Sequence, residues 1–503
     1  MAHARSLSVY LGLAPDVRPL QVFVSLSSAA VSISLLVFIS ASTPFVLSSL
    51  LDVPAGRTGD ITGSLILADE LTALALYLPV GGLCDRYGVK YVASGGYVIT
   101  AVALVLYVQC ASVWELILVR ILFAAGAASL VATISAILSS LSRVPDLRLN
   151  LNDSEISERS PLLSEGNETP NKSGRLAGML GFSSGVGALV SVFGYLRLPN
   201  FLSRFLTSPS PDPLARALAL TYYLVAGLAV LEGAFVFCAL PSRSQHPSSG
   251  PGATPTRGYR VALRRLASSL GKGFTVAKGN RDVSLALFTS FATRAQAVVV
   301  TAMIPLLVNR YYLGHDLCHP APTLAIPDMP NKHSCKQAYV LASILTGIVQ
   351  LVTLLVSPLV GFVASSPLLS RKSRNPQAVV LAVAFLLGTV ASTGFGFLPG
   401  GDPRQHVVVV FVLGLGIAQA AGTVVSLALV TKGRGTVVAH EGKEVGGRLG
   451  ILLIGSTGGI LFDRVNSSAP FLLLAVVNLV VAVSAVRVYF SSPAPLDDHD
   501  SSR

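Results

Sequence analysis

The feature of this sequence that most limits its fold is a series of long apolar stretches separated by shorter polar segments. Each stretch approaches or exceeds the roughly 20 residues that an α-helix needs to cross the hydrocarbon core of a bilayer. Only closed barrels and helices satisfy their backbone polar groups there, so we expect an all-α polytopic membrane protein with twelve transmembrane helices. The expected spans are about residues 22–51, 61–83, 91–110, 115–140, 174–198, 216–240, 284–308, 338–362, 377–398, 406–430, 446–462 and 469–490.

The composition excludes a soluble globular protein. The chain is 52% hydrophobic and 12% charged, whereas about a quarter of the residues of a soluble domain are charged. A net charge of +12 would suit a nucleic-acid partner only on a water-soluble domain with a basic face. The apolar stretches leave no segment of the chain for such a domain. The expected partners are therefore the lipid bilayer and small solutes, without nucleic acid.

No signal for an enzyme is present. The phosphate-binding pattern G-x-x-x-x-G-K-[ST] does not occur, which argues against transport driven by ATP. We expect no catalytic residues, no cofactor and no metal.

The basic residues predict the orientation. Most of the 37 Lys and Arg residues lie in loops that share one side with the N-terminus, and such loops are typically cytoplasmic. Both termini are thus expected in the cytosol. The expected organisation is an N-terminal tail (1–21), a six-helix half (22–240) with a polar insertion (141–172), a linker (241–283), a second six-helix half (284–490) and a C-terminal tail (491–503).

A short charged segment, Pro79 to Lys90, separates the second and third spans and reads P-V-G-G-L-C-D-R-Y-G-V-K. It resembles the loop between helices 2 and 3 of the major facilitator superfamily, which is written G-x-L-x-D-R-x-G-x-[KR]. We expect Gly81 and Gly82 to allow close backbone approach and Gly88 to form a turn. The positions that match and form the candidate gating motif are Gly82, Asp85, Arg86, Gly88 and Lys90, together with Leu83.

The resemblance implies a fold and a mechanism. Members of this superfamily consist of two pseudo-symmetric six-helix bundles with a substrate site between them near the midplane, and they transport by alternating access. It also implies that the carboxylate of Asp85 faces the start of helix 11, near Gly446 and Gly447, when the outer side is open. The N-terminal dipole of that helix would favour an anion there.

Two segments also support an internal duplication. The segment from Gly174 to Gly185 on the fifth span aligns without a gap with the segment from Gly447 to Gly458 on the eleventh, and both begin G-R-L. The fifth span thus matches the eleventh, which lies six spans further along the chain. The second half lacks the Asp-Arg pair of the loop motif.

Ionisable residues inside the spans are the candidate functional residues. A charge near the bilayer centre costs about 2.5 to 3.5 kcal/mol on insertion scales and normally faces a partner or a wet cavity. A static buried ion pair and a role with protons or substrate both remain open. The residues are Asp69 and Glu70 on the second span, Arg120 on the fourth, Glu232 on the sixth and Arg294 on the seventh.

The resemblance ranks these residues. Helices 4 and 7 of the superfamily line the central cavity, helix 2 borders it and helix 6 is peripheral, which places Glu232 last. The segment Leu118 to Ala128 resembles the helix 4 motif, in which an intramembrane Arg is often used in proton coupling. Arg120 matches that Arg, although Phe123 and Ala124 replace the usual Gln and Gly. We therefore expect protons as a second partner, with Glu70 ahead of Asp69 as the acid coupled to Arg294 or Arg120.

The first span carries hydroxyl side chains in addition to its apolar residues. Such hydroxyls more often bond back to their own helix or link neighbouring helices than contact a substrate. They are Ser25, Ser32, Ser40, Ser42 and Thr43.

Two polar loops carry further signals. Glu158 to Leu163 reads E-R-S-P-L-L and resembles the acidic dileucine signal that sorting adaptors recognise. Glu158, Leu162 and Leu163 would then direct the protein to a vacuolar or endolysosomal membrane, and without such a signal the plasma membrane is the expected location. In the loop after the seventh span, Cys318 and Cys335 are candidates for a disulfide in an oxidising compartment, with a metal site or free thiols as the alternatives.

These observations predict a secondary active transporter of small solutes that is coupled to protons. A transporter-derived sensor or scaffold without transport, and an uncoupled facilitator, remain the alternatives. The acids and bases inside the spans favour transport.

Overall fold

The computed structural model describes residues 19–54, 56–141, 172–203, 213–240, 280–315, 317, 336–364, 375–398, 401–431 and 436–491. Throughout these ranges the regular structure is helical. The all-α class that the apolar stretches predict is therefore confirmed.

The first half consists of long helices, one of which is built from several segments. The fifth span runs through α6, a π-helical turn η1, a 3₁₀ turn η2 and the short α7. The elements are α2 (Pro19–Ser49), α3 (Thr58–Tyr87), α4 (Val89–Tyr107), α5 (Val113–Leu141), α6 (Lys172–Leu189), η1 (Val190–Gly194), η2 (Tyr195–Arg197), α7 (Leu198–Leu202) and α8 (Pro213–Ala239).

The second half also consists of long helices, one of which is built from several segments. Its first span is interrupted by the π-helical turn η3, which joins α10 to α11. The elements are α10 (Arg281–Val298), η3 (Val299–Met303), α11 (Ile304–Gly314), α12 (Lys336–Ala364), α14 (Pro376–Gly396), α15 (His406–Thr431), α16 (Thr436–Arg464) and α17 (Ala469–Ser491).

Ten helical segments of the described chain are long and apolar enough to cross a membrane, so the protein is a multi-pass membrane protein. The long helices α3 and α16 are not among the ten. Both nevertheless pack along the other helices. Twelve membrane crossings therefore stay a prediction for these two helices.

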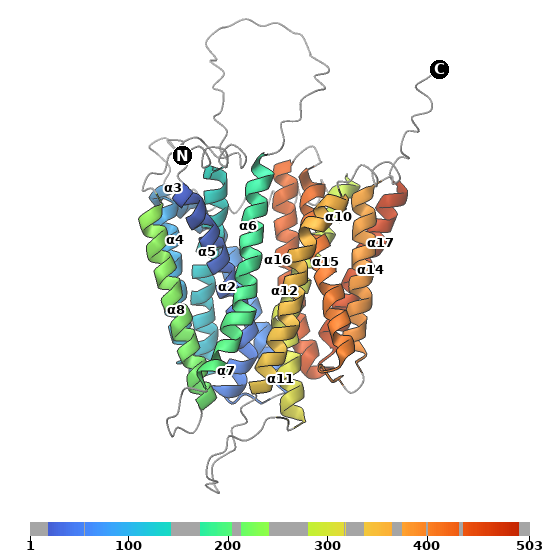
Figure 1. Cartoon of the computed structure of the whole chain (residues 1–503). Helices are drawn as coiled ribbons and strands as arrows, with labels where there is room; N and C mark the ends of the chain where they lie inside the picture. The colour runs from blue at the N-terminus through green and yellow to red at the C-terminus, as the bar shows by residue number, and fades with distance from the viewer. Residues whose placement is uncertain are drawn as a thin grey trace, which may run out of the picture.

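The helices run side by side in a single bundle (Figure 1). Within the first half α4 packs on α5 and α8, and α2 packs on α6. Within the second half α14 packs on α17 and α15. The beginning of α2 and the end of α17 lie at the same end of the bundle (Figure 1). We call this the inner end, because the sequence predicts that it faces the cytosol, and we call the opposite end the outer end.

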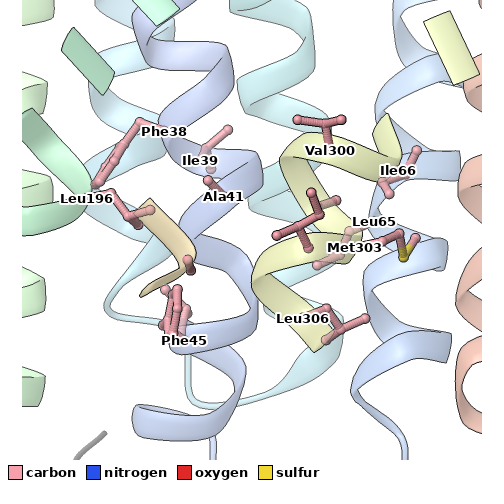
Figure 2. Packing of buried hydrophobic residues seen from close by; sticks show 14 of the residues in the cluster. Phe38, Ile39, Ala41, Phe45, Leu65, Ile66, Leu196, Val300, Met303 and Leu306 are labelled. Carbon is pink, nitrogen blue, oxygen red and sulfur yellow. The ribbon is translucent and has the colours of Figure 1, made fainter. Parts of the chain in front are cut away.

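The two halves share one apolar core. Figure 2 shows Phe45 of α2, Leu65 and Ile66 of α3, and Val300 and Met303 of η3 packed in one buried cluster. Because this cluster combines side chains from both halves, it closes the space between them where it lies. A second buried cluster belongs to the second half alone.

The helices α3 and α16, one from each half, approach most closely near the outer end. A Cβ atom added to Gly59 would lie 2.7 Å from the carbonyl oxygen of Gly459, and one added to Gly63 would lie 3.1 Å from the carbonyl oxygen of Gly455. Glycine at these positions therefore allows direct contact between the two backbones. The outer end of the α3–α16 interface is closed in this structure.

Three local features differ from the expected spans. The eleventh span was expected to begin at about residue 446, but α16 already begins at Thr436, since the apolar-stretch criterion does not detect the polar first turns of a long helix. Spans five and seven contain the π-helical turns η1 and η3. Such turns occur mostly as single insertions and are frequent at functional sites.

Candidate functional site

The acids and bases inside the spans form two separate ion pairs, which use neighbouring residues of α3. In the first pair, Arg120 of α5 donates from Nε to both carboxylate oxygens of Asp69, at 3.0 and 2.8 Å. The side chain of Arg120 is 2% exposed and that of Asp69 is 22% exposed. This pair therefore lies within the first half and its cation is withdrawn from solvent.

Aromatic residues surround the guanidinium of Arg120. Its Cζ lies 5.9 Å from the ring centroid of Tyr107 and 5.7 Å from that of Phe123, which suits cation–π attraction. The Tyr107 ring stacks on that of Tyr222, with centroids 5.5 Å apart. The first ion pair is therefore embedded in a buried layer that joins α3, α4, α5 and α8.

Hydroxyl groups of α2 complete this layer. Thr43 Oγ1 lies 3.1 Å from the hydroxyl of Tyr107, and Ser42 Oγ lies 2.7 Å from that of Tyr222. Both residues also donate to backbone carbonyls one turn earlier in α2. These hydroxyls thus link helices and bond back to their own helix, as the sequence interpretation of the first span suggested.

The second ion pair joins the two halves. Arg448 of α16 donates from Nη1 to Oε2 of Glu70 over 3.4 Å, and the side chains are 22% and 13% exposed. Glu70 follows Asp69 directly, and consecutive residues of an α-helix point about 100° apart. Asp69 consequently faces the interior of its own half, whereas Glu70 faces the other half.

Arg294 belongs to the same region. It lies on α10, and its Cγ would be 2.8 Å from a Cβ atom added to Gly447 of α16, the residue before Arg448. Arg294 also acts electrostatically on Glu70. Its side chain is exposed although its neighbours Ala295 and Gln296 are fully buried, which is typical of an intramembrane charge that faces a wet cavity.

A third charged cluster lies at the outer end of the α3–α16 interface. Asp463 of α16 accepts the backbone N–H of Asp60 at 2.7 Å and pairs with Nη1 of Arg310 at 3.2 Å. Its side chain is only 2% exposed. Asp463 therefore caps the N-terminus of a helix from the other half and links it to α11.

The loop motif forms the turn that its glycine predicted. Gly88, between α3 and α4, has φ of 92°, a conformation that residues with a Cβ rarely adopt. Lys90 lies over the ring of Phe237 at 4.2 Å and so ties the start of α4 to α8. The side chain of Asp85 lies outside the described part of the chain, and its proposed contact with α16 stays a prediction.

The close backbone approach expected at Gly81 and Gly82 was wrong for the conformation in this structure. A Cβ atom added to either residue would meet nothing within 4 Å. The reason is positional, since these residues lie on the inner part of α3, whereas the close contacts of α3 with α16 occur at its outer end.

Glu232 lies apart from both ion pairs. Its carboxylate accepts a hydrogen bond from Ser27 of α2 at 2.7 Å, which links α8 to α2. This position agrees with its low rank among the candidates. Glu158, Leu162, Leu163, Cys318 and Cys335 lie outside the described residues, so the sorting signal and the disulfide stay predictions.

Sequence reasoning missed Arg448. It lies only two residues inside the span expected from about residue 446, and it was counted with the basic residues of the loop before that span. The repeat contained the signal, because the G-R-L of the eleventh span places Arg448 two residues into the segment that aligns with the fifth span. The capping acid Asp463 was missed for the same kind of reason, since the eleventh span was expected to end at about residue 462.

Comparison with protein families gives one match over most of the chain. The family described as the Major Facilitator Superfamily matches residues 22–440. A comparison with curated protein sequences returned no match.

Solved structures of similar fold are transporters. A crystal structure of a point mutant of the nucleoside transporter NupG has a TM-score of 0.61 at 14% identity and covers 93% of this chain and 100% of that chain. A POT family transporter in complex with 5-aminolevulinic acid has a TM-score of 0.63 at 12% identity, with coverages of 95% and 98%. At such identities the likeness shows the fold.

Proposed function

The chain belongs to the major facilitator superfamily, and from this premise we propose that it is a secondary active transporter of small solutes, coupled to protons, that works by alternating access. Its relatives in fold include a nucleoside transporter and a transporter crystallised with 5-aminolevulinic acid. Nucleosides and 5-aminolevulinic acid are small polar solutes, which supports the proposed substrate class.

The observation that carries the proposal is the ion pair between Glu70 and Arg448. It connects the two halves near the middle of α3 and α16, the pair of helices that also forms the outer contact. Rocking of one half against the other would separate Glu70 from Arg448 while leaving Asp69 and Arg120 together, because the latter two belong to the same half. Glu70 is thus the acid whose charge partner depends on the conformation.

This dependence gives a simple coupling scheme. In the outer-closed state described here, Arg448 favours ionised Glu70. When the outer end opens, Glu70 loses that cation in a membrane interior where an uncompensated charge is costly, and proton uptake restores neutrality. Closing the outer end returns Arg448 to Glu70 and releases the proton toward the inner side. A proton bound on one side would therefore leave on the other.

The test replaces Glu70 with glutamine, which keeps the shape of the side chain and removes its charge. The solute would be identified by comparing the solute contents of cells with and without the gene, and the purified protein would then be reconstituted in liposomes. We expect Glu70→Gln to exchange labelled solute across the membrane at a rate near that of the wild type. We also expect it to lose uphill accumulation under an imposed pH gradient.

Glu232→Gln is the matched control, since it removes another carboxylate from a membrane helix outside both ion pairs. It should accumulate solute as the wild type does. Uphill accumulation by Glu70→Gln equal to that of the wild type would reject Glu70 as the coupling acid. A wild type that only equilibrates solute, with or without the gradient, would identify an uncoupled facilitator instead.

A further inference from the structure

A cavity of about 450 Å³ lies at the outer end of the bundle, near the ends of α7 and α11 (Figure 1). Pockets that bind small molecules typically measure about 300 to 1,000 Å³, so this cavity has the size of a ligand site. It is separate from the α3–α16 contact. Its described lining residues are Asn200 of α7, Tyr312 of α11, and Gln337, Val340, Leu341 and Ile344 of α12.

The inner limit of the cavity is a direct contact between the halves. Arg197, three residues before Asn200, donates from Nε to Oγ of Ser343 of α12 at 3.0 Å. Further in, the ring of Phe193 packs against Gly347 of the same helix. These contacts separate the cavity from the central ion pairs, so an occupant enters from the outer side.

The shape of the cavity depends on closure of the outer end, because its lining comes from both halves. Asn200 belongs to the first half and the other lining residues belong to the second. A molecule that contacts both sides therefore binds the outer-closed conformation more tightly than one in which the halves are apart. A ligand shifts an equilibrium between two states by its difference in affinity for them.

The described lining combines hydrogen-bonding groups with apolar ones. Asn200 is half-buried and Gln337 is exposed, and each carries a primary amide with two N–H donors and an acceptor oxygen. Val340, Leu341 and Ile344 add branched aliphatic surface. None of the described lining residues carries a charge at neutral pH, so an ion would lose hydration there without a counter-charge from them. The lining favours an uncharged molecule.

We propose that this cavity is a regulatory site for an uncharged small molecule that carries an amide and a branched aliphatic group. The amides of Asn200 and Gln337 hydrogen-bond the amide of the ligand, and the aliphatic residues of α12 contact its apolar part. The bound molecule joins α7 to α12, holds the outer end closed and slows the conformational cycle. This site is additional to the proposed function and does not assign the transported solute.

Thermal unfolding of the purified full chain measures binding without depending on transport. The probes share one branched skeleton and differ in the polar group. At neutral pH 2-propylpentanamide is uncharged, 2-propylpentanoate is an anion and 2-propylpentylamine is a cation. A ligand that binds the folded state raises Tm. We expect the amide to raise Tm and neither ionised analogue to do so.

Variants connect the effect to the cavity. Asn200→Leu and Gln337→Leu should each weaken binding of the amide about two- to tenfold, the loss expected for one neutral hydrogen bond. Ile344→Trp fills part of the cavity and should abolish the rise in Tm. Gln109→Leu is the matched control, because Gln109 is an exposed amide at the outer end of the bundle, after α4. It should bind the amide as the wild type does.

A further variant tests whether the molecule joins the halves. A side chain at position 459 would collide with the backbone of α3, so Gly459→Leu favours separated outer ends and should bind the amide more weakly than the wild type. Equal affinity would show that the bound molecule does not hold the outer end closed, which would overturn the regulatory role.

The binding site itself would be overturned by any of three results. These are a wild type whose Tm the amide does not raise, an equal rise with either ionised analogue, and a rise that persists in Ile344→Trp. The segment 318–335, which joins α11 to α12, lies outside the described residues. A cavity filled by this segment would give the first result.

Discussion

Arg120 and Arg448 differ in how completely each is committed to its carboxylate. Arg120 is almost fully buried, contacts both oxygens of Asp69 and lies between aromatic rings. Arg448 contacts one oxygen of Glu70 at a longer distance and is partly exposed. The first pair has the features of a fixed structural element, and the second has those of a contact that opens. We propose that the two interpretations left open by the sequence, a static pair and a functional pair, apply to different neighbours on α3.

This difference predicts opposite effects of mutation on stability. Arg120→Leu leaves the partly buried Asp69 without its partner, and breaking a fully buried pair in this way typically costs about 3 to 5 kcal/mol, which sets the upper bound here. We expect a large fall in expression and in Tm, partly recovered in the double variant Asp69→Leu/Arg120→Leu. Glu70→Gln should keep a Tm close to that of the wild type. An Arg120→Leu protein as stable as the wild type would show that this pair is not structural.

At the residue scale, sequence reasoning identified the ionisable residues but not how they pair. The cost of a membrane charge singles out Asp69, Glu70, Arg120 and Arg294 without any structure. Their partners depend on helix rotation and on which helices are neighbours, and a linear sequence does not give either. Arg448 was missed because hydropathy places helix ends poorly where a helix extends into polar sequence.

At the scale of elements, the contact between α3 and α16 is formed by glycines. Where Gly59 and Gly63 meet Gly455 and Gly459, the two backbones touch without intervening side chains. Asp463 adds a cap from α16 onto the N-terminus of α3, where a negative charge is stabilised by the helix dipole. Close packing and the cap together hold the outer end closed.

Enlarging one of these glycines should open the outer end. A side chain at position 459 would collide with the backbone of α3, so Gly459→Leu should favour the state in which the outer ends are apart. The reporter is a cysteine at Leu65, which is 1% exposed within the shared core, in a background without native cysteines. Its reaction with a membrane-impermeant thiol reagent added from the outer side should accelerate manyfold.

Gly227→Leu on α8 is the matched control, because a Cβ atom there meets nothing within 4 Å. It should leave the labelling rate of the reporter unchanged. If Gly459→Leu also leaves that rate unchanged, the glycine contact does not control the outer closure.

The positions of most helices followed from the apolar stretches, since a membrane span needs a long run of apolar residues. The turns η1 and η3 were not predictable in this way, because hydropathy does not report a change in hydrogen-bond register within a helix. Phe193 of η1 packs against Gly347 of α12, and Val300 of η3 packs in the shared core. Both irregular turns thus lie where the halves meet.

At the scale of the whole molecule, the structure corresponds to one conformation of the proposed transport cycle. The α3–α16 glycine contact and the cap of Asp463 join the halves at the outer end, and the shared core joins them further along the bundle. The inner part of α3 around Gly81 and Gly82 has open space. A second state, with the outer end apart and Asp85 against the start of α16, would complete alternating access between the two halves.

The central claim is that protonation of Glu70 releases the outer-closed state, and distances within the molecule test it most directly. Spin labels at Arg57 and Val465, exposed residues at the outer ends of α3 and α16, report the outer closure. Labels at Tyr91 and Phe490, exposed at the inner end, report the opposite change. Pulsed electron–electron double resonance on the reconstituted protein gives both distances without knowledge of the substrate.

Acidification should lengthen the outer distance and shorten the inner one, since neutral Glu70 no longer holds Arg448. Glu70→Gln should show the acid distribution already at neutral pH and should no longer respond to acid. The account would be contradicted if the two distances did not change with pH in the wild type and if Glu70→Gln gave the same distances as the wild type.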